Sequence, residues 1–213
     1  MKIRKLSGID LTDHKALDEA FATLEVHHID SCNWAEEYPY APKADFRIFH
    51  TGSHIALRFE VEEEVTAAVE TKDNGKVWED SCGEFFIAID EQTYYNIEVS
   101  CIGYALANYR RGRKQILAEA DEKILSGLIR IPSLGTEPFA ERQGDNRWTL
   151  TLLIPTTLMH QHKLESWDGV RARGNFFKGG QGLSKLHFLS WNPIPLPEPN
   201  FHCPEYFADL EFE

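Results

Sequence analysis

The sequence has no long hydrophobic run, and this absence excludes one class of protein. Across its 213 residues, no segment approaches the run of about 18 apolar residues that a membrane-spanning helix needs. Residues 1–21 also lack the apolar centre of about 7 to 15 residues found in a secretory signal. We therefore expect a protein outside the membrane, which is either cytoplasmic or secreted with its leader removed.

Positive charge is scarce as well. The chain has 22 Lys and Arg against 34 Asp and Glu, which gives a formal net charge of −12 at pH 7. This charge repels phosphate backbones at long range, and basic clusters such as residues 109–114 (YRRGRK) are too short to reverse the repulsion. Nucleic acid is therefore not an expected partner.

Cysteine is rare, and no C-x-x-C pair occurs among the four present. The four lie in apolar or strand-like contexts, which favours free buried thiols over a zinc site. They are Cys32, Cys82, Cys101 and Cys203. Cys82 and Cys101 come close in the hairpin described below, so a disulfide between them stays open for an oxidising compartment.

The motifs of several enzyme classes are missing. The nine histidines have no third acid or cysteine at a recognisable metal-ligand spacing. The glycine-rich residues 178–185 (KGGQGLSK) lack a nucleotide-binding pattern, and a turn between strands is the better interpretation. No G-x-S-x-G elbow is present. Acyl transfer and phosphate-loop chemistry thus have no support.

What the sequence does contain is a series of short strands. Hydrophobic and charged residues make up 42% and 26% of the chain, as in an ordinary globular protein, and no linker or repeat divides it. Alternating polar and apolar residues predict strands at 46–51, 54–61, 66–71, 147–155, 170–177, 185–191 and 205–213. Helices are expected only within 10–24, behind a cap at Thr12 or Asp13, and within 118–129. The expected fold is all-β, an antiparallel two-sheet β-sandwich with one or two short helices, as a single domain over 1–213.

One predicted hairpin, in residues 76–101, carries acids and aromatics side by side. If Asp90 pairs with Tyr94, then Phe85 faces Val99 and the alternation gives one apolar face. The other face holds Glu84, Phe86, Ala88 and Asp90 on one strand, with Tyr94, Asn96, Glu98 and Ser100 on the next. This mixed face is either an ordinary solvated surface or a surface that binds a ligand.

The two glutamates of that face allow two functions. As diagonal neighbours, Glu84 and Glu98 would be about 7 to 8 Å apart, within the range of about 6.5 to 9.5 Å of an inverting glycosidase pair. Acids on such a surface also serve simply as acceptors for hydroxyl groups. We favour binding over hydrolysis, because a catalytic cleft needs more than one hairpin.

The proline-rich residues 191–207 (WNPIPLPEPNFHCPEYF) cannot pair regularly in a sheet. They form either a structured loop or a linear ligand for a proline-reading domain. Because they lie between two predicted strands, a structured loop is favoured. Such a loop is a stiff platform for Phe201.

Three stretches carry a family resemblance. Residues 77–90 (VWEDSCGEFFIAID), 94–103 (YYNIEVSCIG) and 188–212 (FLSWNPIPLPEPNFHCPEYFADLEF) resemble the family 9-like carbohydrate-binding modules, including variants common in polysaccharide-degrading bacteria. The resemblance extends from about His27 to Glu213. It implies a β-sandwich that binds a saccharide, at a chain end, without turnover.

The resemblance also assigns residues. Trp78 and Phe201 match two aromatics that clamp the terminal sugar, and Glu84 matches an acid that accepts its hydroxyl hydrogen bonds. Glu98 falls where some members have a basic residue. Asn96 adds an amide, and Trp191 is the remaining tryptophan most readily placed in the site. Core positions are nevertheless favoured for all four of these tryptophans, Trp34, Trp148, Trp167 and Trp191.

Several alternatives stay open at this point. Members of the family bind calcium, and no loop here matches a calcium pattern residue by residue. Whether the chain acts alongside a separate glycoside hydrolase is also open. The alternatives to sugar binding are a glycoside hydrolase that uses Glu84 and Glu98, and a protein-interaction module on the same fold.

Overall fold

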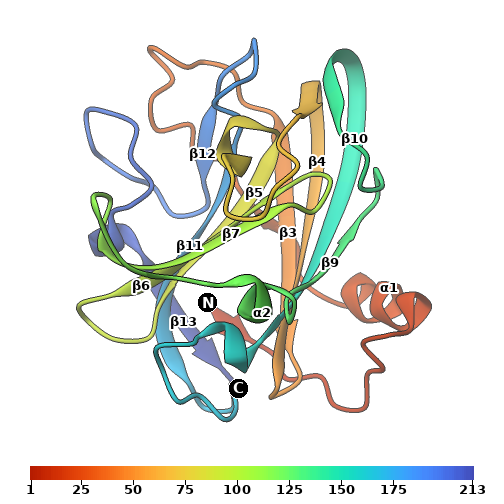
Figure 1. Ribbon diagram of the computed structural model, residues 1–213, viewed down its shortest axis with the longest axis vertical. Coiled ribbons are helices and arrows are strands. Elements are labelled where there is room, and N and C mark those ends of the chain that lie inside the picture. The colour runs from red at the N-terminus through yellow and green to blue at the C-terminus, as the bar shows by residue number, and fades with distance from the viewer.

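The computed structural model describes residues 1–213 and consists mainly of two facing β-sheets (Figure 1). The larger sheet has eight strands in the order β1-β13-β11-β5-β6-β7-β8, with β12 also pairing with β11. Their bounds are β1 Lys2–Ile3, β5 Cys82–Ala88, β6 Tyr94–Ser100, β7 Ala105–Gly112, β8 Gln115–Glu119, β11 Arg171–Gly179, β12 Phe188–Ser190 and β13 Ala208–Phe212. The predicted two-sheet β-sandwich is confirmed.

The smaller sheet has five strands in the order β2-β3-β4-β10-β9. Their bounds are β2 His27–His28, β3 Lys43–His50, β4 His54–Ala68, β9 Ile129–Pro132 and β10 Phe139–Pro155. The two long strands, β4 and β10, pair with each other along most of their length. None of the helices in the structure is long and apolar enough to cross a membrane.

The main core lies between the sheets and is built around stacked aromatic rings. Phe46 of β3 stacks on Phe176 of β11 with ring centroids 3.9 Å apart, and Phe85 of β5 stacks on Phe176 at 4.6 Å. All three side chains are buried. This stack joins the two sheets, because aromatic pairs bury large apolar areas.

The helices are short and lie outside this core. Asp13 caps α1 (His14–Ala22) by accepting hydrogen bonds from the backbone N–H groups of Lys15 and Ala16, which confirms the predicted helix and its cap. Leu17 and Phe21 pack on the outer side of the five-stranded sheet, where Figure 1 shows α1. The helix predicted within 118–129 is only the short α2 (Glu122–Leu125).

The register predicted for the hairpin is wrong by two residues. Phe85 pairs with Ile97 and not with Val99, and Ile87 pairs with Tyr95. The reason lies in the turn: Asp90 accepts hydrogen bonds from the backbone N–H groups of Gln92 and Thr93, so it belongs to the turn and cannot pair with Tyr94. A shift of two keeps each side chain on its face, so the apolar face is still core.

The second face of the hairpin is neither solvated nor freely exposed. A smaller apolar cluster covers part of it, made by Trp34, Phe86, Ala88, Tyr94, Phe177, Ile194, Phe201 and Phe207. Residues 191–200, which include four of the prolines, form an irregular loop over this cluster, as the sequence predicted. The indole N–H of Trp34 donates to the carbonyl of Leu196 at 2.8 Å, which anchors the loop.

Other strand bounds differ from the expectation. Residues 66–68 belong to β4, so no separate strand covers 66–71. The strand predicted at 185–191 is reduced to β12, and β13 begins only after a 3₁₀ turn at Pro204–Tyr206. Strands β7 and β8 were not predicted. The glycine-rich residues 180–187 form a turn between β11 and β12, as expected.

All four cysteines are free thiols, as the sequence favoured, and all but Cys32 are buried. Cys82 and Cys101 are therefore not joined by the disulfide that had stayed open. Burial raises the pKa of both thiols well into the alkaline range. Both are therefore uncharged thiols of the interior.

Candidate functional site

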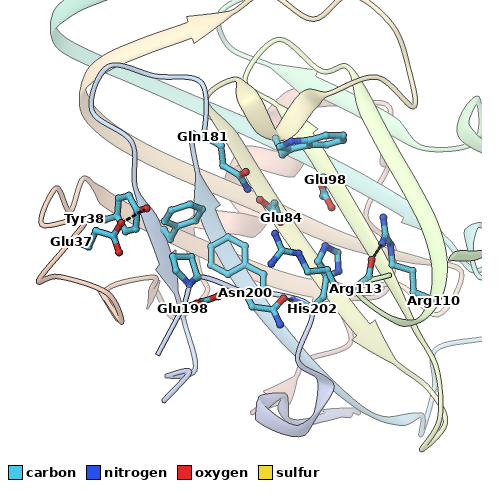
Figure 2. A pocket seen from close by; sticks show the side chains of 14 residues that line it. Glu37, Tyr38, Glu84, Glu98, Arg110, Arg113, Gln181, Glu198, Asn200 and His202 are labelled. Atoms are coloured by element: carbon cyan, nitrogen blue, oxygen red, sulfur yellow. Dashed lines mark hydrogen bonds between the residues drawn. The ribbon is translucent and has the colours of Figure 1, made fainter. Parts of the chain in front are cut away.

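A cavity of about 630 Å³ opens beside the hairpin and the proline-rich loop (Figure 2). Residues from eight separate segments of the chain line it: Glu37, Tyr38, Trp78, Glu84, Glu98, Arg110, Arg113, Gln181, Phe188, Glu198, Pro199, Asn200, Phe201 and His202. Most of these side chains are polar. The cavity therefore suits a polar ligand with a limited apolar surface.

Two carboxyl groups form the floor of this cavity. Glu84 on β5 and Glu98 on β6 are directly opposite each other in the antiparallel ladder, and their exposed fractions are only 3% and 4%. Burial and the charge of Glu98 raise the pKa of Glu84 well above its usual value. Burial also raises the pKa of Glu98 to about 7. The pair therefore keeps at least one proton near neutral pH.

Three neighbouring side chains orient this pair. The thiol of Cys82 donates to Oε1 of Glu84 at 3.6 Å. The amide of Asn96 donates to Oε1 of Glu98 at 2.7 Å and accepts from Nε of Arg110 at 2.8 Å. Asn96 thus bridges Arg110 and Glu98 through hydrogen bonds. Both Asn96 and Arg110 limit the rise in the pKa of Glu98.

Trp78 reaches the cavity from a rigid 3₁₀ turn, Val77–Glu79, and its side chain is half-buried. The carbonyl of Trp78 accepts from the backbone N–H of Gln181 at 3.1 Å, and that of Glu79 accepts from Gly182 at 2.8 Å. A Cβ at position 182 would lie 2.7 Å from the carbonyl oxygen of Glu79, so this contact requires glycine. The glycine-rich turn therefore holds Trp78 in place.

A second aromatic group lies around Phe201. Its ring stacks on Phe177 with centroids 4.3 Å apart and meets Phe188 edge-to-face at 5.9 Å. Tyr38 in turn meets Phe188 at 5.1 Å. Phe201 is only 6% exposed, whereas Tyr38 and Phe188 are half-buried and offer more free ring surface.

Basic residues complete the cavity. Arg110 and Arg113 come from β7 and the turn after it, and Figure 2 shows both near His202. His202 lies within hydrogen-bond distance of the hydroxyl of Tyr94, at 2.9 Å. Burial and the two arginines lower the pKa of His202 to about 3, so its ring is neutral.

The structure brings together most of the residues expected from the sequence. Trp78, Glu84, Glu98 and Phe201 all line the cavity. Asn96 is fully buried behind Glu98 and does not line it.

Trp191 also lies outside the cavity. Its ring packs against the main core, 5.7 Å from Phe176 and 6.1 Å from Phe46. Trp34, Trp148 and Trp167 are buried, as predicted.

Sequence reasoning missed the basic side of the cavity and part of its rim. Arg110 and Arg113 belong to the basic cluster 109–114, whose charge alone argues only about nucleic acid. Gln181 lies in the glycine-rich segment that was interpreted as a turn and nothing more. A basic cluster directly after a hairpin with buried acids was the signal that could have identified the arginines.

A β-sandwich with a cavity of carboxyl groups, amides and aromatic rings defines a class of saccharide-binding module. The comparison with known families is more specific: the model of carbohydrate-binding family 9 matches residues 13–212. The chain therefore belongs to this family. No curated protein matches the chain in sequence.

Solved structures agree with this assignment. A candidate carbohydrate-binding protein from Bacteroides uniformis is 38% identical, with a TM-score of 0.94 over 100% of this chain and 98% of that chain. A family 9 module from Caldicellulosiruptor kristjanssonii has the same fold in two complexes. In its glucose complex, the module is 10% identical in sequence to this chain, with a TM-score of 0.62 over 100% of this chain and 95% of that chain. Its cellotriose complex is 12% identical, with a TM-score of 0.61 over 100% and 94%.

Calcium, which the family resemblance raised, does not fit an evident side-chain site. No three His, Cys, Asp or Glu side chains gather in an arrangement that could hold a metal ion. The buried carboxylate of Glu63 is bound by the ammonium group of Lys178 at 2.9 Å.

Proposed function

We propose that this protein binds a saccharide without turnover in the cavity beside the hairpin, with a chain end held next to Trp78. The observation that carries the proposal is the convergence of Trp78, the aromatic group around Phe201 and two buried carboxyl groups on one cavity. Family membership supports it independently. The complexes of the Caldicellulosiruptor kristjanssonii module with glucose and cellotriose are consistent with it.

The chemistry of a sugar matches these groups. A sugar ring presents C–H groups to an aromatic face, while its hydroxyl groups need directional donors and acceptors. Trp78 supplies an aromatic surface, and Tyr38 and Phe188 add ring area on the side of Phe201. Glu84 and Glu98 supply acceptors, while Gln181 and Asn200 supply both donors and acceptors.

The two-residue register shift removes the spacing that had suggested an inverting hydrolase. The expected diagonal spacing had suggested an inverting pair, but Glu84 and Glu98 are directly opposite, where Cβ atoms are about 4.5 to 5.5 Å apart. Both side chains project from the same face of one sheet. A glycosidase instead needs its two carboxyl groups on either side of the scissile bond. Binding therefore has the stronger support.

A glycan array on the purified chain, followed by calorimetry on any hit, tests the proposal. We expect a dissociation constant in the roughly micromolar to millimolar range, because a small polar ligand in an open cavity buries little area. Because Glu84 keeps its proton in the free protein, Glu84→Gln should weaken binding by about 0.5 to 1.5 kcal/mol, the range for one neutral hydrogen bond. An exposed β13 variant, Glu211→Gln, is the matched control.

Hydrolysis is tested on the same ligands. Wild type and Glu84→Gln are incubated overnight with a panel of oligosaccharides and the products are separated by chromatography. We expect no released sugar from either protein. Cleavage by wild type that disappears in Glu84→Gln would establish a hydrolase and overturn the proposal. Action beside a separate glycoside hydrolase stays a prediction.

A further inference from the structure

The two carboxyl groups at the cavity floor have no cationic partner of their own. Glu84 is contacted by the Cys82 thiol, and Glu98 by the Asn96 amide. No Lys, Arg or His nitrogen of the chain forms an ion pair with either group, although both line the cavity. Buried carboxyl groups that face each other without an ion-pair partner are unusual, because desolvation and mutual repulsion are then only partly compensated.

The nearby cations of the protein are bound to other groups. Lys178, one strand away on β11, places its ammonium 2.9 Å from the Glu63 carboxylate and donates to the carbonyl of Gly179 at 2.7 Å. Arg110 donates through Nε to the side-chain oxygen of Asn96 at 2.8 Å and through Nη1 to the backbone carbonyl of Arg113 at 2.7 Å. Neither cation forms an ion pair with Glu84 or Glu98, although Lys178 and Arg110 still lower the pKa values of these glutamates somewhat.

The other two basic residues that line the cavity, Arg113 and His202, form no ion pair with Glu84 or Glu98 either. The side chain of Arg113 is exposed and forms no ion pair, and the buried His202 ring is neutral because its pKa is lowered to about 3. The paired glutamates therefore retain a proton between them in the free protein. That proton can be replaced by a cation that a ligand brings into the cavity.

We propose that the cavity selects a saccharide with a free amino group, whose ammonium group is held by the carboxylates of Glu84 and Glu98. The ammonium would donate to both carboxylates, and the proton held by the pair would be released to solvent. This inference rests on the proposed saccharide-binding function and names its ligand class. It makes Glu98 a specificity-determining residue.

The charge of the whole cavity agrees with a cationic ligand. Its acidic residues outnumber its arginines, and the acids are Glu37, Glu84, Glu98 and Glu198 against Arg110 and Arg113. The chain as a whole carries a formal charge of −12. A uronate or sulfated sugar would be repelled at long range and would place its anion against the buried pair, so an anionic sugar is the poorer match.

Three disaccharides of one linkage and nearly one shape test the inference: β-1,4-linked glucosamine disaccharide, its N-acetylated form and cellobiose. Each is titrated calorimetrically into wild type at about pH 6.5, below the value of about 7.7 to 8.0 typical of an α-amino group. We expect the free amine to bind at least about tenfold more tightly than cellobiose. The titration is repeated in buffers of different ionisation enthalpy, and proton release is expected for the free amine alone.

Variants then assign the effect to the pair. Glu98→Gln should reduce the preference for the amine to within about twofold and remove the proton release. The ratio of the two affinities is the readout, because the loss of a hydroxyl acceptor weakens cellobiose binding as well. Glu211→Gln, an exposed control on β13, should keep both properties. Binding of cellobiose without a preference for the amine overturns the inference and leaves saccharide binding standing. Failure of the amine disaccharide to bind overturns it as well, and the glycan array then decides the proposed function separately.

Discussion

Glu84 on β5 lies directly opposite Glu98 on β6, and both carboxyl groups are buried at the floor of one cavity. Adjacent strands seldom place like charges directly opposite, because the repulsion is destabilising. Here the arrangement is kept by Cys82 and Asn96, which hydrogen-bond the two carboxyl groups from the same face. The repulsion between the two glutamates destabilises the free protein. Such a cost is expected at a binding site where only the bound ligand compensates the two carboxyl groups.

This cost should depend on pH. A carboxyl group has a pKa of about 4.3 when unfolded, whereas burial raises that of Glu98 to about 7 in the folded protein. The folded state thus holds more protons than the unfolded state between these values, so stability falls as pH rises through this window. Glu98→Gln removes the ionisation and should raise the melting temperature more at about pH 8 than at about pH 5. The gain at the higher pH should be on the order of 3 kcal/mol.

Thermal unfolding of wild type and Glu98→Gln at the two pH values checks this prediction, with Glu211→Gln as an exposed control. An equal change in melting temperature at both pH values would show that Glu98 has the same pKa in the folded and unfolded states. The buried environment described for the carboxyl pair would then be wrong.

Trp78 should contribute more to ligand affinity than any other tryptophan. Trp78→Ala is expected to weaken the calorimetric affinity of a confirmed saccharide at least about tenfold, because the sugar loses its stacking surface. Trp78→Phe should restore part of the loss.

Trp191→Phe serves as the matched control, since Trp191 packs against Phe46 and Phe176 in the main core. Its affinity should equal that of wild type. An unchanged affinity in Trp78→Ala, with circular dichroism showing a folded protein, would remove Trp78 from the site.

The side chains on the core face of the hairpin should contribute most of the stability that the hairpin provides. Ile87 is fully buried in the main core and pairs with Tyr95, so Ile87→Ala should cost about 2 to 5 kcal/mol of unfolding free energy. Chemical denaturation measures this loss. Val69→Ala is the comparison, because Val69 is 63% exposed and its loss should be small. Equal midpoints for Ile87→Ala and wild type would contradict the observed packing.

The buried ion pair between the sheets should be sensitive to the loss of one partner. Lys178 and Glu63 come from β11 and β4, and their side chains are 1% and 0% exposed. Lys178→Met leaves the Glu63 carboxylate buried without its cation and should destabilise the protein by about 3 to 5 kcal/mol.

The double variant Lys178→Met, Glu63→Gln should recover part of that loss. The introduced amide oxygen can still accept from the indole N–H of Trp148, which now donates to Glu63 at 2.6 Å. Denaturant unfolding of both single variants and the double variant forms a mutant cycle. Additive losses would show that the two side chains do not interact.

The sequence by itself determined which side of each strand faces the core. Alternation placed Phe85, Ile87 and Ile97 on one face and Glu84 and Glu98 on the other, and a period of two residues fixes this assignment whatever the exact pairing. The cap of α1 was equally local, since Asp13 bonds to residues two and three positions ahead. The fold class follows from such local signals repeated along the chain.

Only the tertiary structure decided the register and the composition of the site. The hydrogen bonds of Asp90 within its turn moved the pairing by two residues, so Glu84 came to face Glu98. The arginines of the cavity come from β7 and the turn after it, which alternation did not reveal. Trp191 packs against Phe46 and Phe176 at the edge of the core. Strand periodicity tells which face a side chain is on, but the segments that meet across that face are selected by long-range packing.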